Sequence, residues 1–309
     1  MTTTRNPNRA LRPLANSVKD LVALLDLEPI EHNIYRGMNR DIGSGRIFGG
    51  QVLAQALVAA QRTIEEDGRS VHSLHGYFIL AGDLDIPVVY FVDRLRDGRS
   101  YTTRRVTAIQ HGRAIFNMAT SFHRHEEGPS HQAEMPDVPG PEGLASELDI
   151  IRERQNQIPS GLRELLTQDR PLEFRPVEPW EPFNPSPGPS LRHTWVRTSG
   201  SCGDDPLHHQ AVLAYASDYG LLGSALAPIG KTVRDVDVMA ASLDHAIWFH
   251  RPFRMDEWLL YAMDSPNLSG GRGFTRGSYF TRDGERIASV AQEGVLRIGR
   301  RSEAGNGRT

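Results

Sequence analysis

The sequence predicts an α+β fold made of two related halves, each with a long helix wrapped by an antiparallel β-sheet. In each half an apolar helical segment precedes four strand-like runs. The halves also match at a nearly constant spacing. Phe78 and Phe249 lie 171 positions apart, and Gly112 and Gly284 lie 172 apart. A spacing that persists across a whole strand meander indicates a duplicated domain.

The first half opens with a predicted helix at 17–27, whose apolar residues recur at helical spacing, and a strand-like segment at 28–37. A glycine-rich loop at 41–50 leads into a predicted helix at 51–64 that is apolar almost all round, which is typical of a buried helix. Asp97-Gly98 and His111-Gly112 are predicted hairpin turns. The strand-like runs of this half are 71–80, 87–95, 100–110 and 113–122.

Residues 126–190 are rich in proline and contain one or two polar helical segments, so we expect a long connection that packs on the surface. The second half repeats the first, with a strand at 191–198 and an apolar helical run within 208–226. Four strand-like runs follow at 237–252, 257–265, 271–282 and 285–298. We expect the two sheets to pair edge to edge, because pairing removes exposed strand edges. The predicted division is a disordered leader at 1–15, a first repeat at 16–125, the connection at 126–190, a second repeat at 191–298 and a disordered tail at 299–309.

Composition narrows the function classes. The net charge of −3 gives no general attraction to nucleic acid or to an anionic membrane. No apolar run approaches the roughly 20 residues of a membrane span. The single cysteine, Cys202, cannot form an intrachain disulfide, and with no secretory pattern at the N-terminus we predict a cytoplasmic location. The histidines at 123–131 and 208–209 lack metal-ligand spacing, so no metal is expected.

Asp218 is the residue that points to chemistry. It lies on the apolar stripe of the second repeat's helical run, where a buried carboxylate is costly unless it is paired. Aligning the two helices places Val52 on Val212 and Val58 on Asp218. One repeat therefore has an aliphatic residue where the other has an acid. Because the fold does not need the acid, we predict a catalytic role for it.

Two strand positions show the same asymmetry. Val71 aligns with Ser242, and Thr120 aligns with Gln292. A carboxylate, a hydroxyl and an amide that converge can hold one water molecule and direct it at an electrophile. His245, three residues after Ser242, offers a Ser-His-Asp triad as an alternative. In a regular strand that spacing places the two side chains on opposite faces, unless a bulge intervenes.

Long motifs add a resemblance. They are "YRGMNRDIGSGRIFGGQVLAQAL" (35–57), "YASD" (215–218), "SLDHAIWFHRPF" (242–253), "RGFTRGSYFTRDG" (272–284) and "QEGVLR" (292–297). These motifs resemble acyl-CoA thioesterase II, a double-hotdog family that hydrolyses acyl-CoA to free acid and coenzyme A. The match runs from about Leu21 to Arg297. It implies an α+β double hotdog in which Asp218, Ser242 and Gln292 bind and activate the attacking water, with serine where the family often has threonine.

The resemblance also implies an acyl-CoA substrate, no metal or organic cofactor, and association into a homodimer or homotetramer. Arg272 is a candidate ligand for the phosphates of coenzyme A, because guanidinium groups suit phosphate. Two other functions stay open. One is a hotdog enoyl-CoA hydratase or dehydratase, which would use a His/Asp pair. The other is a non-catalytic acyl-CoA-binding protein whose 126–190 connection docks a partner.

Overall fold

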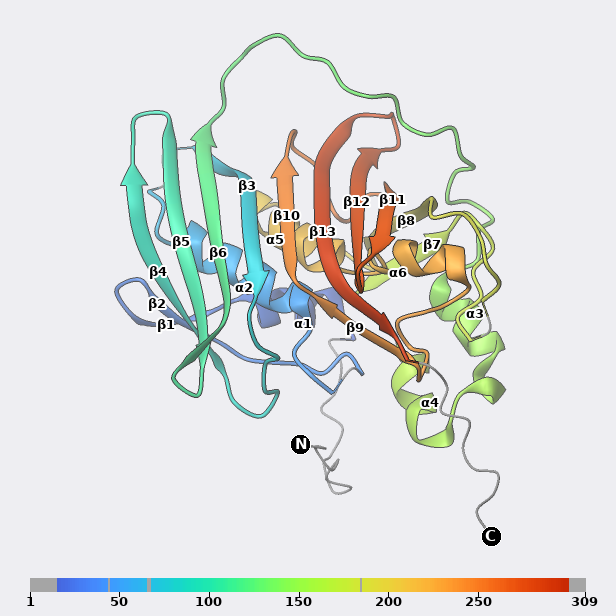
Figure 1. Ribbon diagram of the computed structural model, residues 1–309. Helices are drawn as coiled ribbons and strands as arrows, with labels where there is room; N and C mark the ends of the chain where they lie inside the picture. The colour runs from blue at the N-terminus through green and yellow to red at the C-terminus, as the bar shows by residue number, and fades with distance from the viewer. Residues whose placement is uncertain (1–15, 44, 66–67, 184, 300–309) are drawn as a thin grey trace.

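One antiparallel sheet organises the molecule. The computed structural model describes residues 16–43, 45–65, 68–183 and 185–299, so the leader predicted at 1–15 and the tail residues 300–309 lie outside the described residues. Within these ranges the strand order is β1-β2-β4-β5-β6-β3-β10-β13-β12-β11-β8-β7, with β9 paired to β13 (Figure 1). The two halves of this order mirror each other about the β3–β10 pair. The structure therefore confirms the α+β double hotdog, with the two sheets joined edge to edge.

The elements follow the predicted order. The first repeat comprises α1 (Val18–Leu25), β1 (Glu28–Glu31), β2 (Ile34–Gly37), α2 (Gly49–Gln61), β3 (Arg69–Phe78), β4 (Val88–Asp97), β5 (Tyr101–Gln110) and β6 (Arg113–Arg124). The connection holds α3 (Glu147–Glu153), η1 (Gln155–Gln157) and α4 (Ser160–Thr167). The rest comprises β7 (Leu172–Pro176), β8 (Arg192–Thr198), α5 (Pro206–Ser217), α6 (Gly223–Leu226), η2 (Ala227–Ile229), β9 (Val238–Ser242), β10 (Asp244–Phe249), β11 (Leu259–Ser269), β12 (Arg272–Thr281) and β13 (Arg286–Ile298).

The helices α2 and α5 pack against each other on one face of the sheet (Figure 1). Every residue of α2 from Gly50 to Ala60 is buried, as its all-round apolar sequence predicts. The two helices lie so that each begins where the other ends. Val58, near the end of α2, lines a small cavity together with Leu207 at the start of α5, and Asp218, at the end of α5, contacts Gly50 at the start of α2. Val58 and Asp218 thus occupy equivalent places, as the alignment predicts.

The connection packs mainly on the second repeat. Its first part runs from β6 across the end of the second repeat's sheet (Figure 1). Met135, Val138 and Leu144 pack there against a cluster that includes Trp195, whose ring N–H donates to the carbonyl of Pro139 at 2.8 Å. The strand β7 was not predicted. It lies inside the expected connection and pairs with β8 at the sheet edge. It contains Pro176, and a proline argues against a strand unless that strand lies at a sheet edge.

Three predicted elements end or break earlier than expected. The strand-like segment at 28–37 is a hairpin of β1 and β2, not one strand. The helical run at 208–226 is not one helix, because α5 ends at Ser217 and Asp218 is its C-terminal cap. The strand predicted at 237–252 is interrupted at Leu243. On β13, Gly294 pairs with Ser242 and Ala291 pairs with Ala246, so the β9–β10 side has one extra residue, which is a β-bulge. A bulge re-aims the side chains on either side of it, which matters for the site below.

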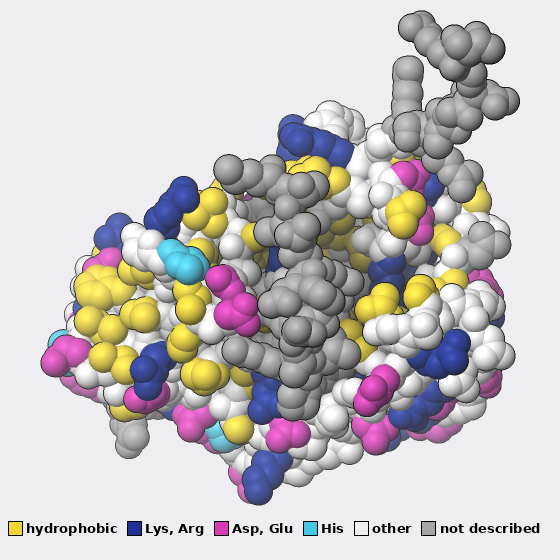
Figure 2. Space-filling view, turned by 90° about the horizontal axis from the view of Figure 1, so that it is seen from below, with side chains coloured by type: hydrophobic (Ala, Val, Ile, Leu, Met, Phe, Trp, Pro, Cys, Tyr) yellow, Lys and Arg dark blue, Asp and Glu magenta, His cyan; other side chains and the backbone are white. Residues whose placement is uncertain are grey.

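The outer surface carries both signs of charge. Figure 2 shows Lys and Arg side chains interspersed with Asp and Glu over the face seen from below, alongside patches of hydrophobic side chains. This mixture agrees with the small net charge of −3. In the described ranges, no helix is long and apolar enough to cross a membrane.

Candidate active site

Asp218, Ser242 and Gln292 meet at one point. The amide nitrogen of Gln292 donates to Oδ1 of Asp218 and to Oγ of Ser242, both at 2.7 Å. The Ser242 hydroxyl lies 3.4 Å from the same Asp218 oxygen. The three side chains come from the end of α5, the end of β9 and the middle of β13. The structure therefore brings together the three residues that the comparison of the repeats singled out.

The second oxygen of Asp218 reaches the other repeat. Its Oδ2 accepts a hydrogen bond from the backbone N–H of Gly50 at 3.0 Å, at the start of α2. Phe48, the N-cap of α2, makes no side-chain capping bond. The carboxylate of Asp218 thus satisfies one of the free N–H groups of α2 and lies at the positive end of its dipole. The candidate site therefore contains groups from both repeats.

Two glycines allow this approach. A Cβ atom on Gly49 would lie 2.6 Å from Oδ2 of Asp218, and a Cβ atom on Gly50 would lie 2.3 Å from the carbonyl oxygen of Tyr215. Any side chain at either position would push the end of α5 away from the start of α2. Gly49 and Gly50, at the end of the loop at 41–50, therefore allow the start of α2 to pack closely against the end of α5 beside the carboxylate.

Burial sets the ionisation of Asp218. Its side chain is only 7% exposed, and burial raises its pKa from 3.8 to about 6. The hydrogen bonds from Gln292, Gly50 and Ser242 act in the opposite direction. The group is therefore mostly ionised at neutral pH, yet it is a much stronger proton acceptor than an exposed aspartate. This combination suits a general base.

His245 also lies beside Asp218. The bulge that the sequence left open as an exception is present at Leu243, and it places Ser242 and His245 on the same side. His245 Nδ1 lies 4.0 Å from Oδ1 of Asp218. Its Nε2, however, lies 2.8 Å from Oγ of Ser217 and not against Ser242. Nε2 of His245 is therefore not placed to take a proton from Ser242, as a Ser-His-Asp triad would need.

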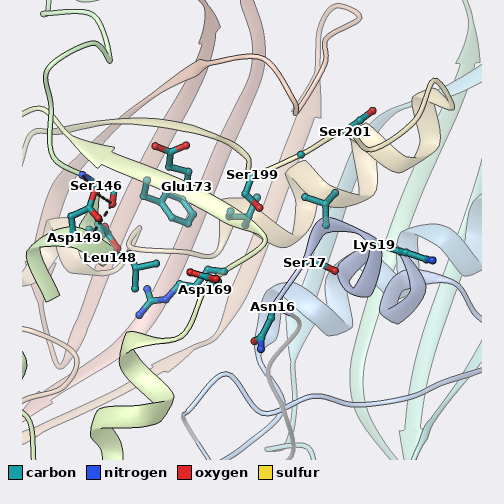
Figure 3. A pocket seen from close by; sticks show the side chains of 16 residues that line it. Asn16, Ser17, Lys19, Ser146, Leu148, Asp149, Asp169, Glu173, Ser199 and Ser201 are labelled. Carbon is teal, nitrogen blue, oxygen red and sulfur yellow. Dashed lines mark hydrogen bonds between the residues drawn. The ribbon is translucent and has the colours of Figure 1, made fainter. Parts of the chain in front are cut away.

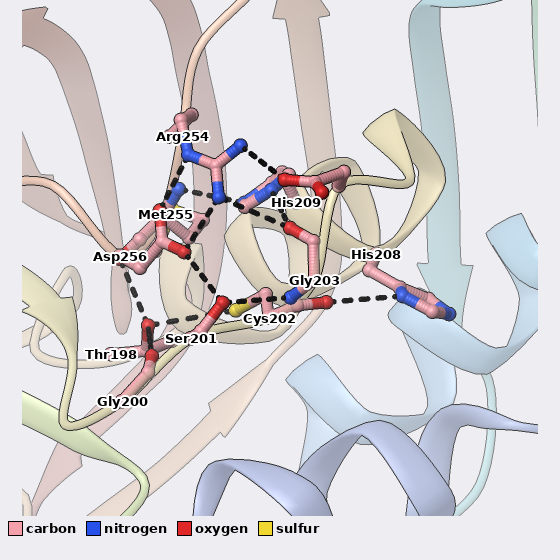
Figure 4. Close-up of polar contacts among 11 residues, drawn as sticks. Thr198, Gly200, Ser201, Cys202, Gly203, His208, His209, Arg254, Met255 and Asp256 are labelled. Atoms are coloured by element: carbon pink, nitrogen blue, oxygen red, sulfur yellow. Dashed lines mark hydrogen bonds and ion pairs between the residues drawn. The ribbon is translucent and has the colours of Figure 1, made fainter.

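A polar network fixes the start of α5 (Figure 4). The Asp205 side chain caps the helix by accepting from the N–H of Leu207 at 2.9 Å. His209 accepts from the N–H of Met255 at 2.9 Å and contacts the carbonyl of Gly203 at 3.0 Å, so its proton is on Nε2. Arg254 bridges Asp256 and the Gly203 carbonyl. His209, one of the histidines considered as a metal ligand, thus uses both ring nitrogens in hydrogen bonds that hold the start of α5.

Known proteins match over nearly the whole chain. Residues 162–295 match a family described as acyl-CoA thioesterase, and residues 39–123 match one described as acyl-CoA thioesterase N-terminal domain. Acyl-CoA thioesterase 2 of Haemophilus influenzae is 39% identical, over 92% of this chain and 99% of that protein. Human acyl-coenzyme A thioesterase 8 is 41% identical, over 90% of this chain and 89% of its own length. The chain belongs to the acyl-CoA thioesterase family.

A solved structure supports the assignment. The crystal structure of acyl-CoA thioesterase II TesB2 from Mycobacterium marinum superposes with a TM-score of 0.73 at 43% identity, covering 89% of this chain and 97% of that chain. A hot dog fold protein from Alicyclobacillus acidocaldarius gives a TM-score of 0.71 at 18% identity, which shows the fold alone. The family assignment rests on the whole chain, whereas the roles of individual residues stay predictions.

Arg272 is not brought together with the other three predicted site residues. It begins β12, is about half exposed and pairs with Glu293 at 3.0 Å. Gln292 is buried, whereas its neighbour Glu293 is partly exposed beside Arg272, so Arg272 and the amide lie on opposite sides of the sheet. A contact between Arg272 and the phosphates of coenzyme A stays a prediction that this position does not favour.

A cavity of about 620 Å³ lies between the start of α1, the connection and β7 (Figure 3). Asp218, Ser242 and Gln292 are not among the residues that line it. Phe174 on its wall packs against Tyr219, the residue after Asp218, with ring centroids 5.3 Å apart. We assign the chemistry to the converging side chains and not to this cavity. Among the described residues, no cluster of three or more His, Cys, Asp or Glu side chains is placed to hold a metal ion.

Proposed function

We propose that this chain hydrolyses the thioester bond of an acyl-CoA with a water molecule held by Asp218, Ser242 and Gln292. The observation that carries the proposal is the convergence of these side chains in one repeat, while the other repeat has Val58, Val71 and Thr120 at the equivalent positions. The acyl-CoA thioesterase family to which the chain belongs supports the substrate class.

The hydrogen bonds assign a role to each residue. Gln292 donates both protons of its amide, one to Asp218 and one to Ser242. The oxygen of Ser242 is therefore an acceptor for Gln292, and its own proton is left to point toward Asp218 or toward a water molecule beside it. The water donates to the carboxylate and accepts from the serine hydroxyl. This arrangement directs a lone pair of the water at the thioester carbonyl.

The reaction then proceeds by addition and elimination. The water oxygen bonds to the carbonyl carbon while Asp218 takes the water proton. The C–S bond of the tetrahedral intermediate breaks, and the proton held by Asp218 passes to the departing thiolate. The products are the free acid and coenzyme A, and the carboxylate is regenerated.

The start of α2 is the candidate oxyanion site. Within the described residues, the backbone N–H of Gly49 donates no hydrogen bond, while the next N–H, of Gly50, binds Asp218. A free N–H at the positive end of a helix stabilises developing negative charge on a carbonyl oxygen. One repeat would thus supply the base and the other the donor for the oxyanion.

The other two functions fit the geometry less well. A hydratase or dehydratase would need the histidine of a His/Asp pair to reach the substrate. The Nε2 atom of His245 contacts Ser217, and burial lowers the pKa of the ring to about 3, so the histidine stays neutral. A non-catalytic binding protein has no need for a carboxylate whose pKa is raised to about 6 beside a hydroxyl and an amide.

Release of free thiol from a panel of acyl-CoA esters tests the function. A thioesterase releases coenzyme A with every turnover and forms the free acid. A hydratase would add water to an enoyl-CoA without releasing thiol, and a binding protein would do neither. Thiol release that is absent across short, medium and long acyl chains would overturn the proposal. Association into a homodimer or homotetramer and a cytoplasmic location stay predictions.

A further inference from the structure

The ring of Phe48 joins the two helix ends that meet at the candidate site. Phe48 is the N-cap of α2, so its backbone begins that helix. Its side chain packs on the end of α5, which belongs to the other repeat. The centroid of its ring lies 5.1 Å from that of Tyr215 and 4.7 Å from that of Tyr219, in the edge-on and tilted arrangements that aromatic pairs prefer. Phe48 therefore contacts residues on both sides of Asp218 in the sequence.

The two residues that follow Phe48 carry the backbone N–H groups of the site. Gly50 donates to Asp218 at 3.0 Å, and the N–H of Gly49 is the candidate oxyanion donor. Neither glycine has a side chain that could anchor it, and glycine backbone adopts many conformations. A Cβ atom on Gly50 would lie 2.5 Å from Cε1 of Phe48, so the ring folds back over Gly50. The side chain of Phe48 is thus placed to hold these two N–H groups against the end of α5.

The next side chain of α2 anchors the helix start in the other direction. The buried amide of Gln51 accepts from the N–H of Arg40, and it donates to the carbonyl of Met38 and to the side chain of Asn39, each at 3.2 Å. All of these partners belong to the first repeat. Gln51 therefore fixes the start of α2 within its own repeat, whereas Phe48 fixes it against the repeat that carries the carboxylate.

The equivalent junction, between the start of α5 and the end of α2, is built differently. The helix alignment that places Val58 on Asp218 replaces the residues of all three rings, and their counterparts are His208, Gln55 and Ala59. His208 contacts the carbonyl of Cys202 at 3.2 Å. A cavity of about 200 Å³ is lined by His208 together with Val58. The fold therefore tolerates a junction of this kind without the three rings, so we expect them to have a role tied to the site.

We propose that Phe48 is a positioning residue whose ring, held by Tyr215 and Tyr219, sets the place of the Gly49 N–H relative to Asp218. A thioester carbonyl that accepts from Gly49 while Asp218 activates the attacking water needs the two groups at a fixed separation. The inference rests on the proposed thioesterase function, and thiol release by the unaltered chain is therefore measured first. If that chain releases no thiol, both proposals fail. If it releases thiol and the variants below behave otherwise than expected, only the positioning role is overturned.

The main test keeps or removes the ring that faces Phe48. Tyr219→Phe keeps the ring and loses only the hydroxyl, whereas Tyr219→Leu removes the ring and stays apolar. We expect Tyr219→Leu to lower kcat by about 10- to 100-fold, the size of effect that misplaced catalytic groups produce, and Tyr219→Phe to stay within about threefold. Binding of a thioether analogue, in which CH₂ replaces the thioester carbonyl, should change little, because the Gly49 N–H acts on charge that develops in the transition state. Equal losses of kcat in the two variants, or a loss in neither, would overturn the proposal.

A double-mutant cycle shows whether Phe48 and Tyr219 act through one contact. Phe48→Leu alone should lower kcat about as much as Tyr219→Leu, roughly 10- to 100-fold. Phe48→Leu combined with Tyr219→Leu should lose little more than the worse single variant, because either substitution alone already breaks the contact. Losses that multiply, to about 10²–10⁴-fold, would mean that the two side chains act independently, and the role of their contact would be overturned.

Loss of a ring elsewhere separates positioning from folding. The rings of Phe249 and Phe253 stack with centroids 6.4 Å apart, and Phe249 ends β10 at the opposite end from Ser242. Phe253→Leu is therefore the matched control: it should lower the melting temperature and leave kcat unchanged. If kcat falls as far in this control as in Phe48→Leu, the losses follow general stability and the positioning role is overturned. If Phe48→Leu does not fold, the comparison of phenylalanine with leucine at position 219 still decides the question.

Discussion

The starts of the two central helices differ in how they are capped. α5 begins with its own cap, Asp205, and with His209, whose ring contacts the loop carbonyl of Gly203. α2 begins without a side-chain cap, and Gly49 stands at the position that aligns with His209. The missing cap is supplied from the other repeat by Asp218. One helix start is capped by its own residues, and the other is capped by a carboxylate from the other repeat.

The difference shows how a duplicated fold can divide its tasks. The end of α2 carries Val58 and meets a helix that is already capped, which favours stability. The end of α5 carries Asp218 in a setting that raises its pKa to about 6, which costs stability at neutral pH. Under the proposed mechanism, stability and chemistry are assigned to separate copies of one backbone, in line with the general trade-off between them. The predictions below test this division from its largest expected effect to its smallest.

The largest effect is expected from Asp218→Asn. Asparagine keeps the size of the side chain and much of its hydrogen bonding but cannot accept the water proton. We expect kcat to fall by about 10²–10⁴-fold, the range for loss of a general base, with little effect on the binding of an acyl-CoA analogue. Steady-state thiol release and analogue binding measure the two quantities. An active but unstable Asp218→Asn protein would make the carboxylate a scaffold and refute the mechanism.

The same variant has a stability signature. Because the folded state holds the Asp218 proton more tightly than the unfolded state, the penalty is absent below the unfolded pKa of 3.8 and fully present above about pH 6. Its size is on the order of 3 kcal/mol. Asp218→Asn should therefore raise the melting temperature at pH 7.5 and change it little near pH 4. A variant that is less stable at pH 7.5 would contradict this reading.

The next effect concerns Ser242. Ser242→Ala removes the hydroxyl that Gln292 holds at 2.7 Å, and we expect a loss of kcat of about 10- to 100-fold. Ser242→Thr keeps the hydroxyl and should retain substantial activity. Ser242→Val, which copies Val71 of the first repeat, has the shape of threonine without its hydroxyl and should match alanine. If alanine and threonine variants behaved alike, a water-positioning role for Ser242 would be wrong.

Much of the fold could be predicted because the duplication presents the same pattern of helical and strand-like segments twice. The two buried helices, the strand meanders and their edge-to-edge pairing follow from periodicity and constant spacing. The strand β7 could not be predicted, because Pro176 and the proline-rich flank conceal a strand that is viable only at a sheet edge. The end of α5 at Ser217 was also missed, since apolar spacing continues past it into α6.

The site was predicted in part for the same reason. Asp218, Ser242 and Gln292 were found by asking where the repeats differ in polarity. Ser217 and His245 answer the same question, since they align with Leu57 and Leu74. Ser217 was missed. His245 was considered only as the histidine of an alternative triad, and regular strand alternation counted against it, because an alternation rule does not show whether a bulge is present at Leu243. The contribution of Gly50 to the site could not be predicted, because every residue except proline has a backbone N–H and the sequence does not show which one binds a side chain.

The next prediction concerns the unaltered chain, whose activity should depend on pH. The base must be ionised to act, and the pKa of Asp218 is raised to about 6 by burial. We therefore expect kcat/KM to be flat at neutral pH and to fall below pH 6, approaching tenfold for each further pH unit. Rates of a slow acyl-CoA substrate between pH 4.5 and 8 measure this limb. A limb near pH 4 would mean that Asp218 is not the base or is much better hydrated than its 7% exposure indicates.

The smallest effect on activity is expected from Val58→Asp, which places an acid at the position in the first repeat that corresponds to Asp218. No second active centre should arise. Val71 provides no hydroxyl, and the facing helix start is already capped by Asp205. Turnover per chain should stay within about twofold, and titration with a non-hydrolysable acyl-CoA should still count one site. Val58 is 5% exposed, and the nearby Arg62 already binds Asp26 and the Leu27 carbonyl, so the new carboxylate should destabilise the chain by more than about 1 kcal/mol. Val58→Asn is the neutral control, and the gap in stability between the two should widen as the pH rises. A doubled turnover would show that a carboxylate alone makes a site, and that the division between the repeats rests on one residue.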